Sequence, residues 1–326
     1  MNLKIMAVGF YGEGNLGDEL ILSGLLELLP KNSEVFVTAG HSFVADKRHN
    51  LSAKPVKRRG FIAALSFFKK AFACDLAVFS GGILQDASLE GVTFYALRMF
   101  IAKLAGCKVV LLGAGLGPLK SPLGKLFSRI ALKFVDKAWL RDSYSLELYK
   151  NLGGESGKAF RGTDLSWGLF LCDSIEPKKD GLLLINLRPF KDFNIPSDLL
   201  PKNLNGQKIL PVACRMEDKV FLEKLYEQEA VLVKSLTDFE KLLRKAEKVC
   251  AMRYHMALLA ARSSLSCKFA PYDSKVSELC RETGIPDFSL KNSKFASARK
   301  GFSEENCFIF NRMKQELREY IKENFK

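Results

Sequence analysis

Short apolar runs alternate with longer amphipathic segments along most of the 326 residues. Runs such as residues 4–10, 75–82 and 108–117 are almost continuously apolar, and a segment with helical spacing follows each of them. Apolar strands without alternating polar positions are typical of parallel sheets that are covered on both faces. The sequence therefore predicts an α/β fold built on a doubly wound parallel sheet.

A polar stretch with Pro and Gly at residues 172–181 interrupts this alternation, as expected of an exposed connection. The alternation then starts again and continues to about residue 284. We therefore expect two Rossmann-like domains, residues 1–172 and 173–326, whose strand ends face each other across a cleft. The amphipathic segment 303–326 is expected to form a long helix of the second domain.

The composition restricts the class of protein and of partner. Hydrophobic residues make up 48% of the chain, charged residues make up 26%, and the formal net charge is +14. We expect a cytoplasmic protein, because no apolar run has the length of a membrane span and no leader pattern opens the chain. The charge favours an anionic partner, either a phosphorylated small molecule or a membrane surface, and no nucleic-acid motif accompanies it. Eight cysteines without a C-x-x-C pair predict neither a disulfide framework nor a metal site.

The loop after the first apolar run has the spacing G-x-G-x-x-G, formed by Gly12, Gly14 and Gly17. A dinucleotide site would also need an acidic residue about 20 positions further on, and the second predicted strand ends in VTAGHS instead. The carboxylates of Glu13, Asp18 and Glu19 in and beside the loop would also repel a pyrophosphate. A tight turn whose helix is capped by Asn15 or Asp18 explains the glycines better than nicotinamide binding does.

The whole phrase GFYGEGNLGDELIL at residues 9–22 resembles the opening of the polysaccharide pyruvyl transferase family. Further segments similar to that family follow in order: FSGGILQDAS at 79–88, GAGLGPL at 113–119, WLRDSYS at 139–145, RGTDLSW at 161–167, CAMRYHMALLAA at 250–261 and PYDSKVSELCRETGIP at 271–286. Ser80 and Tyr254 depart from the residues common in the family. The resemblance implies a GT-B-like fold and a reaction that moves the pyruvyl group of phosphoenolpyruvate onto two sugar hydroxyls, with phosphate released and with no metal or other cofactor.

Phosphoenolpyruvate carries a phosphate and a carboxylate, so its site should contain several cations, with arginine favoured for its forked donors. Four cations follow predicted strands or lie in the family-like segments, and we expect them to bind the donor: Arg141, Arg188, Arg253 and Lys275. Two of them have plainer alternatives. Arg141 could pair with Asp142 or Glu147 at the surface, and Lys275 could simply begin a helix that Asp273 caps.

His255 is the histidine inside a family-like segment, and imidazole suits proton transfer near neutral pH. We expect His255 to act in catalysis, with a satisfied structural histidine as the alternative. Asp18 is the second catalytic candidate, as the group that orients or deprotonates the acceptor hydroxyl. Three further residues are expected to hold the acceptor sugar by hydrogen bonds: Asn15, Gln85 and Asp86. His41 and His49 lie in a polar, basic stretch and are expected to be exposed to solvent.

These features together favour a cytoplasmic pyruvyl transferase that acts on a cell-surface polysaccharide precursor. Such a precursor can be lipid-linked, and the basic segment 54–72 would suit docking on the anionic inner face of the cell membrane, although it could equally be an ordinary amphipathic helix. Two other functions stay open: a nucleotide-sugar glycosyltransferase with the same architecture, and a non-catalytic anion-binding protein. The acceptor sugar and the oligomeric state are open as well.

Overall fold

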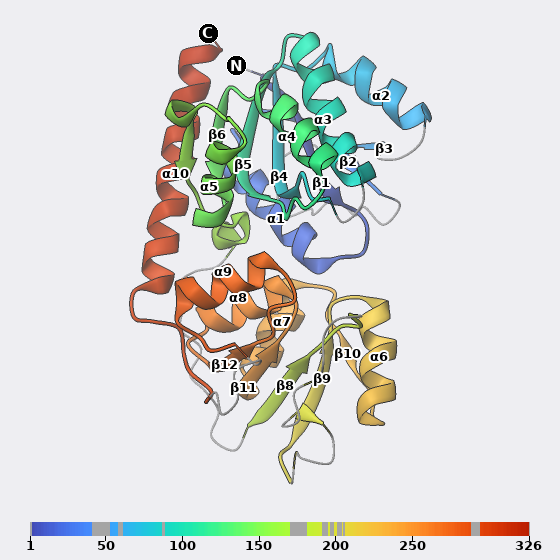
Figure 1. The fold of residues 1–326 in the computed structure, drawn as a ribbon, viewed down its shortest axis with the longest axis vertical. Helices are drawn as coiled ribbons and strands as arrows, with labels where there is room; N and C mark the ends of the chain where they lie inside the picture. Colours follow the sequence, from blue (N-terminus) through green and yellow to red (C-terminus); the bar gives the residue numbers. More distant parts are fainter. Residues whose placement is uncertain are drawn as a thin grey trace. The chain divides into compact units, whose positions relative to one another are not determined.

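The computed structural model divides into two compact units (Figure 1). Unit 1 contains residues 1–170 together with 306–326, and unit 2 contains residues 171–305. The residues that the structure describes are 2–40, 53–57, 61–86, 89–169, 181–190, 195, 199–200, 204, 206–287 and 294–325.

Unit 1 is built on a seven-stranded sheet in which every pair of neighbouring strands is parallel. Its strands, in chain order, are β1 (Lys4–Tyr11), β2 (Glu34–Ala39), β3 (Ala53–Lys57), β4 (Leu76–Ile83), β5 (Lys108–Leu116), β6 (Lys137–Leu140) and β7 (Ala159–Arg161). Their order across the sheet is β3-β2-β1-β4-β5-β6-β7. The apolar runs at β1, β4 and β5 are almost wholly buried, which confirms the predicted doubly wound α/β unit.

Helices cover both faces of this sheet. They are α1 (Leu16–Leu28), α2 (Phe61–Ala71), α3 (Leu89–Leu104), α4 (Pro122–Leu132) and α5 (Ser143–Asn151). The chain moves outward from β1 to β2 but in the opposite direction from β4 to β7, and right-handed crossovers then place α1 on one face and α2 to α5 on the other. Helices α2 to α5 accordingly share one hydrophobic core with the strands, which includes Phe67, Met99, Leu132 and Tyr149.

The segment 54–72, for which membrane docking and an ordinary amphipathic helix were the two alternatives, is divided between two elements. Residues 53–57 form β3, which pairs with β2 at the edge of the sheet, and helix α2 begins only at Phe61. Pro55 has no N–H to donate, so it is tolerated in a strand only at such an edge. The helical spacing seen at Phe61, Leu65 and Phe68 corresponds to α2, and the residues before Phe61 are not part of this helix.

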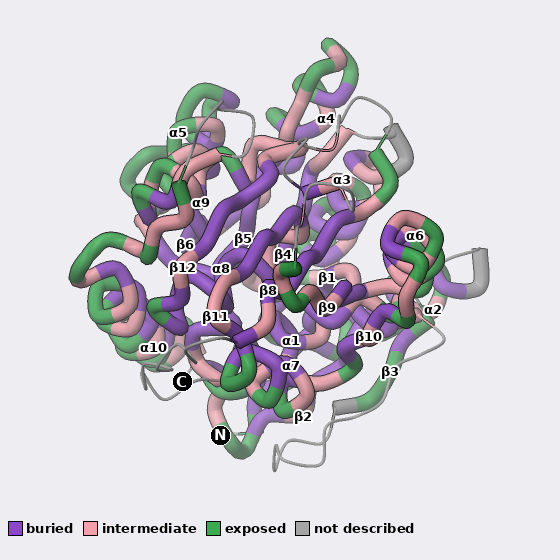
Figure 2. Tube along the Cα trace, turned by 90° about the horizontal axis from the view of Figure 1, so that it is seen from below, coloured by how far each residue is buried: buried purple, intermediate pink, exposed green. Residues whose placement is uncertain are grey.

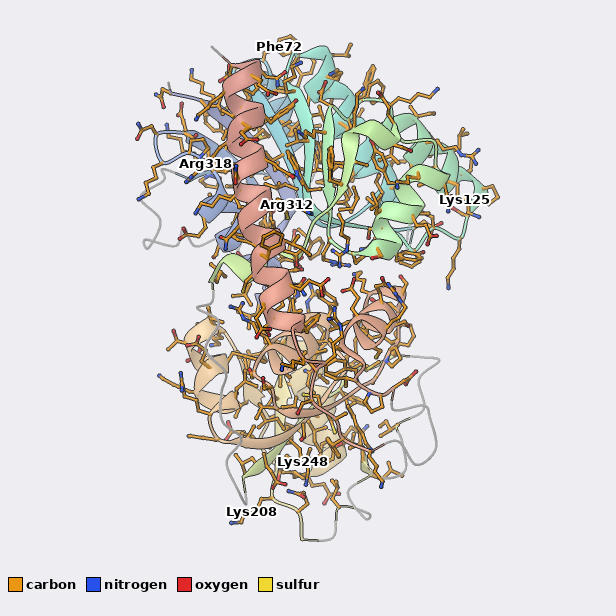
Figure 3. The ribbon with its side chains drawn as sticks, turned by 90° about the vertical axis from the view of Figure 1, so that its left-hand side faces the viewer. Phe72, Lys125, Lys208, Lys248, Arg312 and Arg318 are labelled. Carbon is orange, nitrogen blue, oxygen red and sulfur yellow. The ribbon has the colours of Figure 1, made fainter. Side chains whose placement is uncertain are left out.

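The C-terminal helix α10 (Phe302–Asn324) lies with unit 1 from Asn306 onward, so its assignment to the second domain was wrong. The Trp139 indole donates from Nε1 to Glu316 Oε2 at 2.5 Å, and the apolar stripe of α10 places Met313 and Leu317 in a fully buried position. Figure 3 shows α10 along unit 1, with Arg312 and Arg318 labelled on it. An amphipathic stripe predicts that a helix is covered, but it does not say by which unit.

Unit 2 contains a smaller parallel sheet of five strands in the order β10-β9-β8-β11-β12. These strands are β8 (Leu182–Asn186), β9 (Ile209–Ala213), β10 (Val231–Leu232), β11 (Ala246–Ala251) and β12 (Ser266–Phe269). The helices are α6 (Met216–Tyr226), α7 (Leu236–Leu243), α8 (Tyr254–Arg262) and α9 (Ser274–Thr283). Figure 2 shows the central strands of both sheets as buried. The expected second Rossmann-like unit is present.

Among the described cysteines, Cys74, Cys107, Cys214, Cys250 and Cys267 are free and buried. Cys307 takes part in a disulfide, a bond that the cysteine spacing did not predict. No helix in the described part of the chain has both the length and the apolar character needed to cross a membrane.

Candidate active site

The strand order of unit 1 reverses between β1 and β4, and the chain leaves these two neighbours in opposite directions. In open α/β sheets, ligands bind at the carboxyl edge of the sheet at such a reversal, because the two outgoing loops diverge and leave a crevice there. Asn15 and Asp18 follow β1, and Gln85 and Asp86 follow β4. All four residues predicted to bind or activate the acceptor therefore lie at this point of the sheet.

The loop between β1 and α1 folds around its own carboxylates. Gly12 and Gly14 have φ angles of 68° and 69°, a region that favours glycine, and the Gly12 N–H donates to Glu19 Oε1 at 2.6 Å. Glu19 thus takes the backbone donor that a pyrophosphate would need. Asn15 is the N-cap residue of α1, but its side chain makes no capping hydrogen bond and donates to the Asp18 carboxylate instead.

Glu19 is a functional candidate that the sequence analysis did not identify. Its pKa is raised to about 7, mainly by burial; the hydrogen bond from Gly12 acts against this rise, and the negative charge of Asp18 adds to it. A carboxyl group with a pKa near neutrality can give or take a proton at physiological pH. A signal was present in the sequence, because two adjacent acidic residues, Asp18 and Glu19, occupy the first turn of α1.

Asp18 lies beside the end of β4. A Cβ atom added to Gly81, whose φ is +75°, would lie 3.8 Å from Asp18 Oδ1, so the carboxylate borders the backbone of this strand. Nearby, the Tyr11 hydroxyl forms a buried hydrogen bond with the Ser80 hydroxyl. Ser80 replaces the Gly that is common at this position in the similar family, and its hydroxyl is the partner of a buried tyrosine.

Gln85 and Asp86 follow β4, and they differ in the hydrogen bonds that their side chains already make. Asp86 Oδ2 accepts hydrogen bonds from the backbone N–H groups of Lys120 and Ser121, at 2.7 and 2.6 Å, and so anchors the start of α4. Burial would raise the pKa of Asp86, but these hydrogen bonds hold it below its ordinary value. The Gln85 Nε2 atom is buried and has no hydrogen-bond partner in the described part of the chain. Gln85 is therefore the better of the two for binding an acceptor.

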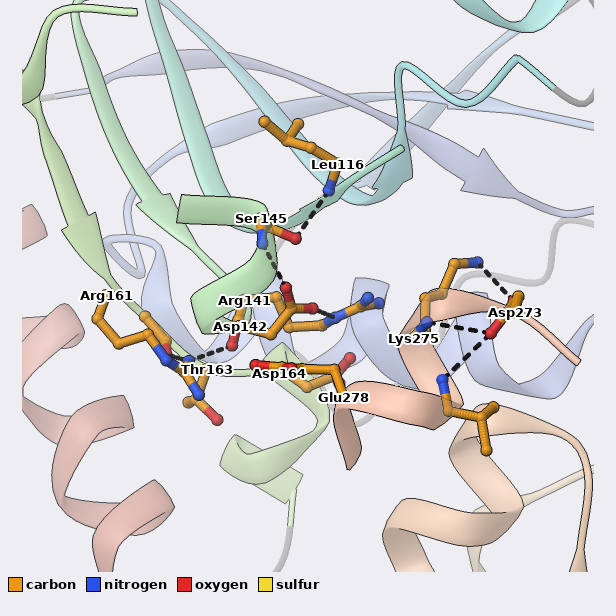
Figure 4. A network of polar contacts seen from close by, with 12 residues as sticks. Leu116, Arg141, Asp142, Ser145, Arg161, Thr163, Asp164, Asp273, Lys275 and Glu278 are labelled. Carbon is orange, nitrogen blue, oxygen red and sulfur yellow. Dashed lines mark hydrogen bonds and ion pairs between the residues drawn. The ribbon is translucent and has the colours of Figure 1, made fainter. Parts of the chain in front are cut away.

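Arg141 follows β6 and is buried together with Asp142 (Figure 4). Its Nε donates to Asp142 Oδ2 at 2.9 Å, and Asp142 also caps α5 by accepting from the Ser145 N–H at 2.7 Å. Burial raises the pKa of Asp142, but Arg141 and Ser145 outweigh this effect and keep the carboxylate ionised. The pairing with Asp142 that the sequence allowed does occur, and it is buried instead of lying at the surface.

The guanidinium of Arg141 is held against β5. A Cβ atom on Gly115 would lie 2.5 Å from Arg141 Nη2 and 2.6 Å from Cζ, so only glycine leaves room for this side chain. The glycine-rich segment 113–119 therefore has a packing function here, beyond forming a turn.

In unit 2, a half-buried cation follows each of four neighbouring strands. Arg188 follows β8, Arg215 follows β9, Arg253 follows β11 and Lys275 follows β12. Because the carboxyl ends of parallel strands meet at one edge, these four cations form a row along the edge of the sheet. Arg215 was missed by the sequence analysis, although it follows the apolar run ILPVA as Arg188 follows LLLIN.

Arg253 is the most strongly held of the four cations. Its backbone N–H donates to Asn186 Oδ1 at 2.9 Å, and its Nε and Nη2 donate to the two oxygens of Asp218 at 2.9 and 2.6 Å. Burial would lower the pKa of Arg253, but the fully buried Asp218 keeps it raised. The bidentate pair engages one side of the guanidinium, so the Nη1 side can still meet an anion.

Tyr272 links two of these arginines. The Arg188 guanidinium lies 4.9 Å from the centroid of the Tyr272 ring, and Phe190 packs edge-on against the same ring at 5.4 Å. Burial and the charge of Asp273 raise the pKa of Tyr272, whereas Arg188 and Arg253 lower it, which places both arginines beside this phenol. Tyr272 was not identified from the sequence, although it lies within the family-like segment 271–286.

His255 and Lys275 occupy the first turns of α8 and α9, and both are half-buried. The His255 ring lies perpendicular to that of Tyr254, with centroids 5.1 Å apart. Asp273 caps α9 by accepting from the N–H groups of Lys275 and Val276, both at 3.1 Å, and Lys275 Nζ lies 3.8 Å from Asp273 Oδ2. The capping expected of Asp273 is confirmed. Helix N-termini attract anions, so both positions add to the positive potential of this edge.

Each unit thus brings its own predicted residues together. Unit 1 holds Asn15, Asp18, Gln85, Asp86 and Arg141 at one sheet edge, and unit 2 holds Arg188, Arg253, His255 and Lys275 at another. That the two sets meet in one cleft stays a prediction. His41 and His49 lie outside the described residues.

Comparison with known proteins agrees with the resemblance seen in the sequence. The sequence model of a family described as polysaccharide pyruvyl transferase matches residues 15–264. This range spans most of the chain and includes the β1–α1 loop from Asn15 onward, the β4 loop, Arg141, Arg188, Arg253 and His255. No curated protein matches this chain.

Solved structures with the same fold are known. Alr3699/HepE from Anabaena, in complex with UDP-glucose, has 12% identity and a TM-score of 0.59, with 99% of this chain and 100% of that chain covered. UDP-GlcNAc 2-epimerase from Methanocaldococcus jannaschii has 12% identity and a TM-score of 0.61, with 97% and 99% covered. UDP-N-acetylglucosamine 2-epimerase from Rickettsia bellii has 13% identity and a TM-score of 0.59, with 98% of each chain covered. At these identities the likeness shows the fold alone, which is the expected GT-B-like fold.

Proposed function

Because this chain belongs to the polysaccharide pyruvyl transferase family, we propose that it moves the pyruvyl group of phosphoenolpyruvate onto a sugar of a cell-surface polysaccharide precursor. The product is a ketal that joins the carbonyl carbon to two sugar hydroxyls, and phosphate is released. The observation that carries this proposal is the row of four cations along one edge of unit 2.

The donor suits this row because it is small and carries up to three negative charges. Arg253 presents its Nη1 side, Arg188 is braced by the Tyr272 ring, and Lys275 adds a compact charge at a helix start. Arg215 supplies a fourth cation from the neighbouring strand. Arg141 of unit 1, which is buried and already oriented by Asp142, is proposed to bind the same donor.

The reaction needs one proton donor and one proton acceptor. We assign to His255 the transfer of a proton to the methylene carbon of phosphoenolpyruvate, which becomes the methyl group of the ketal. A sugar hydroxyl then adds to the neighbouring carbon, the phosphate leaves with the electrons of its C–O bond, and a second hydroxyl adds. Of the two hydroxyl protons, one replaces the proton that His255 gave and the other leaves with the phosphate.

The acceptor is proposed to bind at the strand reversal of unit 1. Gln85 offers a buried amide donor that has no partner in the described residues, and Asn15 holds the carboxylate of Asp18 in place. Asp18, with Glu19 beside it, is proposed to take the proton of the attacking hydroxyl. We further propose a lipid-linked acceptor and a cytoplasmic location, with phosphoenolpyruvate as a co-substrate and no metal or other cofactor.

The test is the release of phosphate from phosphoenolpyruvate in the presence of a panel of nitrophenyl and lipid-linked sugars, with the products weighed by mass spectrometry. A product heavier than its acceptor by one pyruvyl ketal is expected. Arg141→Gln and Arg253→Gln should each weaken donor binding about ten-fold or more, because each removes a charged donor from the anion. Lys158→Gln, at a partly exposed position of unit 1, is the control.

His255→Gln should bind phosphoenolpyruvate but turn it over at least about 100-fold more slowly, as expected for loss of a general acid. Tight binding of a nucleotide sugar with no response to phosphoenolpyruvate would instead establish a glycosyltransferase. Anion binding without turnover of any acceptor in the panel, and unchanged by His255→Gln, would leave the binding protein as the better description.

A further inference from the structure

Helices α2, α3 and α4 of unit 1 each expose a stripe of large apolar side chains. The exposed residues have the spacing i, i+3 and i+7 on all three helices, which places those of one helix on one side of it. They are Leu65, Phe68 and Phe72 at α2, Leu97, Phe100 and Leu104 on α3, and Leu123, Leu126 and Ile130 on α4. Nine of the 14 large apolar side chains that are exposed in the described residues belong to this set, so they are concentrated and not scattered.

The three stripes lie on one surface. Helix α3 packs against both α2 and α4, and all three helices cover the same face of the seven-stranded sheet (Figure 1). Their inward sides are already filled, because Phe67, Met99 and Leu132 pack into the core beneath them. The outward residues lie outside this core. Exposed fractions of 58% for Phe72, 61% for Leu104 and 54% for Leu123 are high for side chains of this size.

The surface is also basic. Helices α2 and α4 contain no acidic residue, and exposed cations stand beside the apolar stripes, among them Lys69, Lys125, Arg129 and Lys133. None of these four has a carboxylate partner in the described part of the chain. Figure 3 labels Phe72 and Lys125 on the outer surface of unit 1.

We propose that this apolar and basic surface of α2, α3 and α4 docks on an anionic lipid bilayer. Apolar side chains flanked by exposed cations match the two layers of such a surface, because the hydrocarbon chains take up the apolar groups and the headgroups carry negative charge. A second copy of the chain fits less well, because self-association would bring Lys125 and Arg129 of α4, and Lys133 just after it, against a surface of the same sign.

The docking surface adjoins the sheet edge at which the acceptor is proposed to bind. Asp86 ties the start of α4 to the loop after β4, so the N-terminal ends of these helices lie at the sheet edge that holds Gln85 and Asp18. A membrane-docked unit 1 would present this edge near the headgroups, where the sugar of a lipid-linked acceptor lies. That last step rests on the proposed function, whereas the docking itself does not.

The experiment is flotation of the full chain with vesicles of phosphatidylcholine, with or without about 30% phosphatidylglycerol, at low and at high salt. Binding is expected with the anionic vesicles and should weaken with added salt. Leu123→Ser, Leu126→Ser and Ile130→Ser combined should weaken it at least about ten-fold, because three apolar groups no longer enter the lipid. The matched control combines Met216→Ser and Val220→Ser, which alter exposed apolar residues of α6 in unit 2.

Insertion can be seen directly with Leu126→Trp and brominated lipids. The natural Trp139 and Trp167 are 0% and 3% exposed, so they should respond little, whereas the new indole should be quenched by anionic brominated vesicles. Absence of binding to anionic vesicles, or binding that the α4 triple variant leaves unchanged, would overturn the proposal. So would a dimer in sedimentation that the same variant disperses, since the occupant would then be a second copy. Turnover of soluble acceptors should persist in that variant, so docking and catalysis can fail separately.

Discussion

Asp218 is fully buried and binds both Nε and Nη2 of Arg253, the residue from which helix α8 starts. The carboxylate comes from α6 and the arginine follows β11, so one ion pair joins two elements of unit 2. A buried carboxylate is costly to desolvate, and here Arg253 compensates for that cost. The pair therefore holds the guanidinium in place and neutralises part of its charge.

Removing one member of this pair should lower the free energy of unfolding by more than the intact ion pair contributes to it. Asp218→Asn is expected to lower the free energy of unfolding by about 3 kcal/mol, because Arg253 is left with an uncompensated charge in a half-buried place. Urea unfolding of Asp218→Asn, Arg253→Gln and the double variant forms a double-mutant cycle. The double variant should be more stable than the two single effects added together predict. Additive effects would show that the two side chains do not interact in solution, and the exposed pair Glu155 and Lys158 provides a control in which little should change.

Gly115→Ala should displace the side chain of Arg141, although the two residues are far apart in the sequence. The new Cβ atom would come within 2.6 Å of the guanidinium carbon, so Arg141 must leave its place beside β5 and weaken its contact with Asp142. We expect a rise of about ten-fold in the KM for phosphoenolpyruvate, with kcat affected less and with a small loss of stability. Steady-state kinetics at fixed acceptor concentration measures this. Gly157→Ala, where an added Cβ atom meets nothing within 4 Å, should have the same KM and kcat as the wild-type protein.

The sequence was sufficient for the parallel sheets because buried strands leave long apolar runs, and the position of a residue after such a run placed Arg188 and Arg253 correctly. It was not sufficient where the outcome depends on tertiary partners. Asp218 lies in the first turn of a helix and reads as a helix-start acid, whereas the fold buries it against Arg253. Asn15 has the residue type and position of an N-cap, yet its amide is used by Asp18, since a competing carboxylate lies three residues away.

Glu19 should make stability depend on pH. Its pKa rises from an ordinary value of 4.5 to about 7 in the folded protein, so the folded state binds the proton more tightly than the unfolded chain does. The stability associated with this group is therefore full below about pH 4.5 and is lost as the pH rises through about 7. Glu19→Gln keeps an acceptor for the Gly12 N–H but has no charge to bury.

The Glu19→Gln variant should match the unchanged protein near pH 4.5 and exceed its free energy of unfolding by on the order of 2 kcal/mol at pH 8, after allowance for partial solvent exposure. Denaturant unfolding at several pH values measures the difference. A difference that stays constant with pH would contradict the raised pKa. Glu27→Gln, on the same helix, serves as the comparison.

Tyr272 should contribute to donor binding more through its ring than through its hydroxyl. The ring face of Tyr272 lies 4.9 Å from the Arg188 guanidinium, and the hydroxyl also forms a hydrogen bond with Arg188. Tyr272→Phe removes only the hydroxyl contact, whereas Tyr272→Leu removes the ring contact as well. We expect Tyr272→Leu to raise the dissociation constant of phosphoenolpyruvate about five-fold and Tyr272→Phe to raise it by no more than about two-fold. Calorimetric titration distinguishes these values. Equal losses in the two variants would assign the effect to the hydroxyl.

The stripe of α10 that faces unit 1 should carry the stability of that helix. Met313 is fully buried, its sulfur accepts the Thr163 N–H at 3.3 Å, and it would lie 3.0 Å from a Cβ atom on Gly162. Met313→Ala leaves a cavity in this contact and should lower the free energy of unfolding by about 2 to 4 kcal/mol. Phe308→Ala on the same helix, with 67% of the side chain exposed, should change it by less than about 0.5 kcal/mol. Equal stability of the two variants in thermal unfolding would show that α10 does not pack on unit 1 as described. The assignment of α10 to unit 1 would then be wrong.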